Sequence, residues 1–185
     1  MVPNTHPGIM VAMPELIDPT SKLRTSFVAA VKEFRADQDY PVPWFVEDVD
    51  PQALVDPAAF EAYTVRVINE RTASGVRPGF VPMTTLWWAD GERFLGRMAI
   101  RHHLTPALEK WGGHIGYDVR PSARRQGHAT AMLAAALPIA KSLGISQALV
   151  MCDKTNVASR RVIEANGGQL INVTDQKRRY WVPTA

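Results

Sequence analysis

HIGYDVRPSARRQGHA, residues 114–129, is the stretch of the chain that decides its fold. Residues 115–119 have the length and composition of a short strand, which Pro121 and Ser122 end. An apolar helix face follows at the spacing i, i+3, i+4, i+7, i+8 and i+11, made by Ala129, Met132, Leu133, Ala136, Leu137 and Ala140. The segment therefore predicts a strand, a basic turn and a long helix in direct succession.

The start of this helix is suited to bind phosphate. The first amides of a helix have no partners within it, and they lie at the positive end of the helix dipole. Gly127 lacks a Cβ, which allows a ligand to approach the backbone. Arg120, Arg124 and Arg125 add charge in the planar form that phosphate prefers. We expect a cradle for a pyrophosphate here; the alternative is a basic loop that only caps the helix.

The elements around this segment alternate between strand and helix patterns. Asp90-Gly91 is a strong turn signal inside a hairpin over residues 82–100, and a loop is expected over residues 104–113. Pro138 lies inside the long helix and should kink it or cost it a hydrogen bond, and Gly144 should end the helix. A buried strand at residues 148–151, a helix at 156–165 and closing strands at 170–173 and 180–182 complete this half.

The first half of the chain carries most of the prolines. A short strand is expected within residues 8–16, followed by a helix with Thr20 as its cap and a face of Leu23, Phe27, Val31 and Phe34. Residues 37–57 form an acidic, proline-rich loop, and Asp56-Pro57 opens a second helix. The order of elements predicts an α+β fold around one mixed sheet.

Composition excludes several classes of protein. The 185 residues are 46% apolar and 21% charged, as in a globular chain of one domain. A single cysteine, Cys152, excludes a disulfide framework and fits a reducing cytoplasm, and no closed zinc pattern is present, so no metal is expected. The net charge of +3 and the absence of a long apolar run indicate neither a nucleic-acid partner nor a membrane span.

The segment also carries a family resemblance. Arg124-x-x-Gly127-x-Ala129 resembles the acetyl-CoA signature R/Q-x-x-G-x-G/A of the GNAT superfamily of N-acetyltransferases, and residues 156–168 are similar to its second cofactor motif. GGHIGYDVRPS and the closing RRYW resemble a bacterial subgroup of predicted acetyltransferases. The match is specific over roughly residues 112–170.

The resemblance implies a GNAT-like sheet of about six to seven strands, flanked by about four helices, in which the fourth and fifth strands splay. It implies one domain over residues 1–185, with the acceptor side in residues 1–80 and the acetyl-CoA core in residues 81–185. The activity it implies is transfer of an acetyl group from acetyl-CoA to a primary amine, with a homodimer left open. The alternative is a non-catalytic sensor that binds acyl-CoA.

Cofactor contacts follow from the resemblance position by position. Val119 should hydrogen-bond the pantetheine arm, and Asn156 should meet it with Ser159 close by; the alternative for Asn156 is a plain helix cap. The pyrophosphate should lie on the backbone amides that follow Arg124, which are those of Arg125, Gln126, Gly127, His128 and Ala129.

The sequence offers candidates for the base that deprotonates the amine and for the acid that protonates the thiolate. Many relatives carry a glutamate early in the fourth strand, where the nearby residues of this chain are Gly113 and His114. His114 could accept the proton of the amine, although a lone strand histidine is commonly structural. Relatives often place a tyrosine acid seven residues beyond the asparagine, but here that residue is Ile163. Tyr180 or Tyr117 could substitute, or the thiolate could leave without an acid.

The acceptor is expected to be a small cationic or aromatic amine. Glu47 and Asp48 in the acidic loop, with Trp44 and Trp87, could receive it. The alternative is a solvated loop whose aromatic side chains fill the core.

Overall fold

The computed structural model describes residues 13–184. Its helices and strands, in chain order, are β1 (Glu15–Ile17), α1 (Arg24–Ala36), α2 (Trp44–Glu47), α3 (Pro57–Asn69), β2 (Met83–Asp90), β3 (Arg93–Arg101), α4 (Pro106–Trp111), β4 (Ile115–Val119), α5 (His128–Ser142), β5 (Gln147–Asp153), α6 (Val157–Ala165), β6 (Gln169–Val173) and β7 (Lys177–Pro183). This is the predicted α+β order, with two short helices added.

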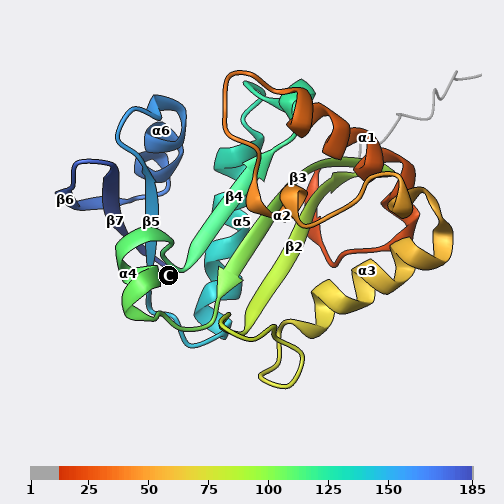
Figure 1. Ribbon diagram of the computed structural model, residues 1–185. Coiled ribbons are helices and arrows are strands. Elements are labelled where there is room, and N and C mark those ends of the chain that lie inside the picture. The colour runs from red at the N-terminus through yellow and green to blue at the C-terminus, as the bar shows by residue number, and fades with distance from the viewer. Residues whose placement is uncertain (1–12, 185) are drawn as a thin grey trace, which may run out of the picture.

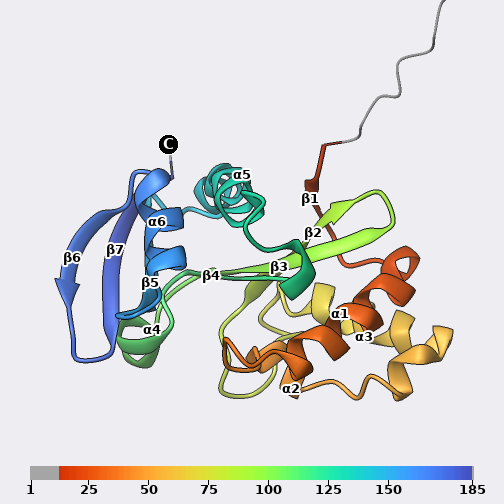
Figure 2. The ribbon, with the colours of Figure 1, turned by 90° about the horizontal axis from the view of Figure 1, so that it is seen from above.

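The strands form one sheet in the order β1-β2-β3-β4-β5-β7-β6 (Figure 1). Every neighbouring pair is antiparallel except β4 and β5, which run parallel. Seen from above, α5 covers one face of the sheet, and α1, α2 and α3 cover the opposite face (Figure 2). The mixed sheet between helices agrees with the predicted fold class.

Each face of the sheet has its own apolar core. On the α5 side, Met132, Leu133 and Ala136 pack on Met98 and Ile115. On the α1 side, aromatic rings gather around Phe27, which stacks on Trp87 with ring centroids 4.8 Å apart and also contacts Phe45, Phe60, Tyr63 and Phe94. Because Trp87 is 0% exposed, it is a core residue and cannot contact a substrate, contrary to the expectation from the sequence.

The parallel pair β4 and β5 is joined only at one end. Ile115 pairs with Val150, and no further pair connects the two strands within residues 13–184. The backbone groups of the even-numbered residues in and beside β4 form the hydrogen bonds to β3. At the two ends of this ladder, the Arg101 amide donates to the His114 carbonyl and the Arg120 amide donates to the Leu95 carbonyl. Backbone groups alternate in an antiparallel ladder, so those of residues 117 and 119 point into the gap between β4 and β5. Figure 1 shows the two strands spreading from their common end, as the predicted splay requires.

Several local predictions are confirmed. Asp56 caps α3 by accepting a hydrogen bond from the Ala59 amide at 2.8 Å, with Pro57 in the first turn. Gly91 has a φ of 55° at the hairpin turn, and Gly144 has a φ of 85° just after α5.

Other local predictions are wrong or only partly tested. Residues 104–113 are not a loop, because Thr105 caps the short helix α4 and Pro106 occupies its first turn. Residues 37–57 likewise contain α2. Pro138 lies inside α5 as predicted, and the helix continues past it to Ser142. The first strand is β1, and residues 8–12 of its predicted range lie outside the described residues.

Candidate active site

A cavity of about 1030 Å³ opens where β4 and β5 separate. Four parts of the chain contribute to its wall: the end of β4, the start of α5, the start of α6 and the loop after α1. The lining residues that matter below are Phe34, Asp39, Tyr40, Tyr117, Asp118, Val119, Arg124, Arg125, Gly127, His128, Ala129, Asp153, Asn156 and Ser159. The cavity therefore joins both predicted cofactor segments to residues of the first half.

The start of α5 presents unused backbone donors to this cavity. Gly127 has a φ of 82°, which favours glycine, and a Cβ placed on it would meet nothing within 4 Å. Arg125 also has a positive φ, of 61°. No acceptor within the described chain pairs with the amides of residues 125–130. The open space in front of Gly127 and this run of free donors form a concave anion site.

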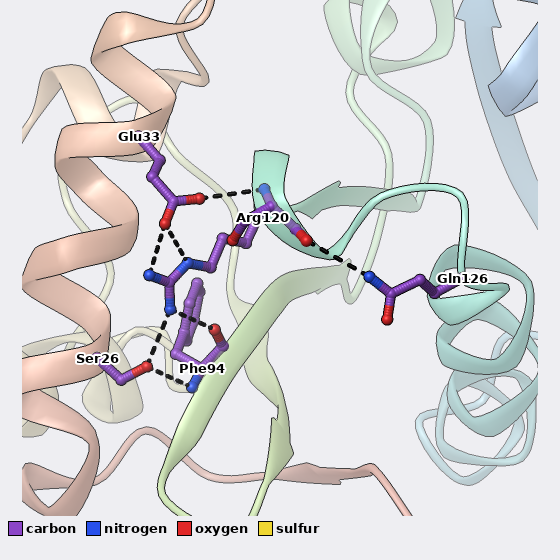
Figure 3. Close-up of polar contacts among 6 residues, drawn as sticks. Ser26, Glu33, Phe94, Arg120 and Gln126 are labelled. Carbon is purple, nitrogen blue, oxygen red and sulfur yellow. Dashed lines mark hydrogen bonds and ion pairs between the residues drawn. The ribbon is translucent and has the colours of Figure 1, made fainter.

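Arg120 is not part of that site. Its guanidinium bonds Glu33 of α1 at 2.6 and 2.8 Å and the Ser26 hydroxyl at 3.1 Å (Figure 3). The second carboxylate oxygen of Glu33 accepts the Ser122 amide at 3.1 Å. Burial raises the pKa of Glu33, but these hydrogen bonds outweigh it and hold the pKa below its ordinary value. Arg120 thus fastens α1 to the end of β4, which corrects its expected place in the phosphate cradle.

Arg124 is also engaged, on the other side of the turn. It pairs with Asp37 at 2.7 Å, donates to the Val119 carbonyl at 3.2 Å and lies over the Tyr40 ring at 4.7 Å. The hydrogen bond from Arg124 lowers the pKa of Asp37. Of the three arginines, Arg125 is exposed and makes no ion pair among residues 13–184. The cradle is therefore formed mainly by backbone amides.

The start of α6 faces the α5 start across the cavity. The Asn156 side chain accepts the Ser159 amide at 2.9 Å, so Asn156 caps the helix and lines the cavity at the same time. The Tyr117 hydroxyl and the Ser159 hydroxyl share a hydrogen bond of 2.7 Å. Burial raises the pKa of Tyr117 well above its ordinary value, so this phenol holds its proton.

His114 lies outside the cavity. Its Nδ1 accepts the Leu149 amide at 2.9 Å, and its own amide donates to the Leu149 carbonyl at 2.7 Å. With Nδ1 occupied, the neutral ring carries its proton on Nε2 and has no free lone pair. His114 therefore clamps β4 to β5, and the structure does not support its expected role as a base.

Of the two tyrosines considered as acids, only Tyr117 reaches the cavity, and Ile163 does not line it either. Tyr180 is 1% exposed and donates to Glu164 at 3.2 Å, away from the cavity lining. Ile163 is buried in the core. Tyr117 is the tyrosine that the structure brings to the cavity.

The loop after α1 reaches the cavity through residues other than those expected. Asp39 and Tyr40 of this loop line the cavity together with Phe34 of α1, whereas Trp44, Glu47 and Asp48 do not. Asp48 pairs with Arg77 at 2.5 Å, and Glu47 is exposed. Trp44 does lie on a cation, but the cation is Arg97 of the chain itself, 4.5 Å from the ring centroid.

Sequence reasoning missed Asp118. It lies between Tyr117 and Val119 on the splayed strand and lines the cavity. The signal was available, because a carboxylate in a short strand that ends at a ligand cradle is exceptional among apolar neighbours.

The described residues contain neither a metal-binding cluster nor a membrane-spanning helix. In residues 13–184, no group of three or more histidine, cysteine, aspartate or glutamate side chains is placed to hold a metal ion. None of the helices in this part of the chain combines the length and apolar character of a membrane span.

Comparison with known proteins places these features in a family. A family model described as an acetyltransferase (GNAT) domain matches residues 24–169. A sequence comparison with curated proteins returned no match.

Solved structures with the same fold include three acetyltransferases. The ribosomal-protein-S5-alanine acetyltransferase of Vibrio fischeri is 12% identical with a TM-score of 0.64, covering 95% of this chain and 94% of its own. Mycobacterium smegmatis RimJ, in complex with CoA-disulfide, is 19% identical with a TM-score of 0.61, covering 93% and 86%. The microcin C7 self-immunity acetyltransferase MccE, in complex with acetyl-CoA and AMP, is 12% identical with a TM-score of 0.61, covering 91% of each chain.

The clamp by His114 predicts a pH effect on stability. Burial, and then the charge of Arg101, lower the pKa of His114. The contribution of the His114 clamp to the free energy of unfolding is therefore complete above the ordinary histidine pKa and is lost as the pH falls through the lowered pKa. His114→Asn keeps an acceptor for the Leu149 amide and should lose less stability between about pH 7.5 and about pH 5 than the wild type. His114→Ala should cost about 1–3 kcal/mol at neutral pH. Urea unfolding measures the free energy of unfolding of the wild type and of both variants. An equal pH dependence of this free energy in all three proteins would contradict the clamp.

Proposed function

The chain belongs to the GNAT acetyltransferase family, and from that premise we propose that it transfers an acetyl group from acetyl-CoA to a primary amine of a small molecule. As a member of this family it is an acyltransferase. The observation that carries the proposal is the run of unpaired amides at residues 125–130, which faces the cavity opened by the splay of β4 and β5.

The residues present fit acetyl-CoA. The amides of residues 125–130 would hold the pyrophosphate, and the open space at Gly127 would admit it. The backbone of Tyr117 and Val119 would pair with the pantetheine arm, and Asn156 faces the same space with an amide group. When bound, acetyl-CoA supplies the acetyl group as a reactive thioester.

The reaction that suits this arrangement is direct attack by the neutral amine. No nucleophilic side chain is needed, because the cavity brings both substrates to the end of β4. Tyr117, which keeps its proton and is oriented by Ser159, would donate a proton to the departing thiolate.

The acceptor end of the cavity favours a cationic amine with an apolar body. Asp39 and Asp118 supply negative charge, while Phe34 and Tyr40 supply apolar surface. The Vibrio fischeri structure is named a ribosomal-protein-S5-alanine acetyltransferase, so a peptide with a free amino terminus is the acceptor to compare.

The cofactor site is tested by a pair of matched glycine variants. Acetyl-CoA at 100 times its Kd should stabilise the wild type by about 2.7 kcal/mol, which raises the melting temperature by roughly 5–10 °C. Gly127→Glu should abolish this shift, because its carboxylate fills the cradle and repels phosphate. Gly144→Glu is the control, since Gly144 has a similar φ and open surroundings at the other end of α5.

Turnover decides between an enzyme and an acyl-CoA sensor. The expected result is acetylation of at least one amine from a panel of agmatine, spermidine, tyramine, tryptamine and a peptide with a free amino terminus. Absence of a thermal shift at millimolar acetyl-CoA, or a shift without turnover of any amine, would contradict the proposed function.

Asp39 should bind the cationic acceptor. Asp39→Asn is expected to raise KM for a cationic amine about threefold to tenfold with little change in kcat, because one exposed charge contributes little energy. Glu47→Gln removes an acidic group of the same loop that does not line the cavity, and its KM should stay at the wild-type value. An unchanged KM in Asp39→Asn would remove this residue from the acceptor site.

A further inference from the structure

We propose that Asp118 is the general base that deprotonates the acceptor amine and that Arg97, its partner across the sheet, is the positioning residue whose positive charge acts on Asp118. The inference rests on the proposed acetyl transfer and names the residue that performs its first proton step. Three observations carry it: the place of Asp118 in the cavity, the freedom of its carboxylate, and the buried cation opposite it.

The position of Asp118 is set by the strand. Tyr117 and Val119 pack on the α5 core, so the side chain of Asp118 emerges on the other face of the sheet, where α1 and the loop after it lie. That is the face on which Phe34 lines the cavity. Asp118 therefore stands beside the backbone groups proposed to hold pantetheine, but on the acceptor side of them.

The carboxylate of Asp118 has no committed partner. Among residues 13–184 it makes no hydrogen bond and no ion pair within 4.0 Å. The other acidic groups near the cavity differ in this respect, since Asp37 is held by Arg124 and Asp153 by Lys177. A half-buried carboxylate that lines a cavity and remains unpaired is free to receive a proton from a ligand.

Arg97 stands directly opposite Asp118 on β3. Side chains of such a pair lie on the same face with Cβ atoms about 5.5 Å apart. Arg97 is 3% exposed, donates to the Thr85 hydroxyl at 3.2 Å and lies under the Trp44 ring. It forms no ion pair in the described chain, so its charge acts on Asp118 without blocking the carboxylate.

Other charged groups around Asp118 come from each neighbouring element. Arg101 on β3 and Arg124 before α5 add positive charge. Asp39 after α1, Asp153 on β5 and His128 on α5 line the same cavity, and behind Arg97 lie Tyr63, Glu70 and Arg77. Burial raises the pKa of Asp118, and the charges of Arg97, Arg124 and Arg101 offset part of that rise. A carboxylate with a raised pKa is a stronger base toward an ammonium group.

The proton balance is simple. The ammonium group gives one proton to Asp118, and the neutral amine then attacks the thioester carbon, forming the C–N bond. The C–S bond breaks, the thiolate takes up one proton, and the nitrogen loses its second proton. One proton is released to solvent through Asp118, so the products are the N-acetyl amine, the free thiol of CoA and one proton.

The test is the pH dependence of kcat/KM, measured with the amine of the panel that turns over fastest. Asp118→Asn should lower kcat/KM at neutral pH by about 10²-fold or more. The loss should shrink as the pH approaches the pKa of the amine itself, because the neutral amine then forms without help. The acetyl-CoA melting shift should remain, which shows that the variant is folded and that the cofactor site is intact.

Arg97→Gln distinguishes a tuned base from a structural pair. Removal of the positive charge should move the acidic limb of the profile to higher pH, whereas a packing defect alone would lower the rate equally at every pH. The proposal is overturned if folded Asp118→Asn keeps its rate within about threefold of wild type, or loses it equally at all pH values. A wild-type protein that acetylates no amine overturns the proposed function and this inference with it.

Discussion

The separation of β4 from β5 is the constraint on which the rest of the site depends. A parallel pair would normally continue its hydrogen bonds along the strand, but here the ladder stops after Ile115 and Val150. His114 holds the joined end through the Leu149 backbone, and the separated end leaves the backbone groups of Tyr117 and the amide of Val119 in the gap, while Arg124 already holds the Val119 carbonyl. Buried backbone groups need partners, so this gap favours an elongated polar ligand such as the pantetheine arm.

Two of the three arginines around the gap form ion pairs with the first half of the chain rather than a phosphate site. Arg120 and Arg124 point back to α1 and its loop through Glu33 and Asp37, so the acceptor side is tied to the turn that carries the cradle. The proposed phosphate site depends on the backbone amides of residues 125–130. A count of basic side chains does not reveal these donors. These ion pairs join the proposed acceptor wall to the turn that carries the proposed cofactor cradle.

Much of the fold could be predicted from the sequence, because the signals were local. The apolar spacing predicted α5, Asp56-Pro57 predicted the start of α3, and the cofactor segments predicted the walls of the cavity. Contacts between distant elements could not be predicted. Glu33 was not matched to Arg120, and Trp87 lies in the core with the four other aromatic rings that contact Phe27. Asp118 had a local signal that was missed, but its pairing with Arg97 across the sheet is a contact of this distant kind.

The central claim is that acetyl-CoA lies between β4 and β5 with its pyrophosphate on the start of α5. Backbone amide NMR during an acetyl-CoA titration tests it most directly, because it reports on the N–H groups themselves. The account predicts that the largest shifts occur at residues 125–130, 117 and 119, with little change in β6. Shifts confined to other surfaces, or none at these amides at saturating acetyl-CoA, would contradict it.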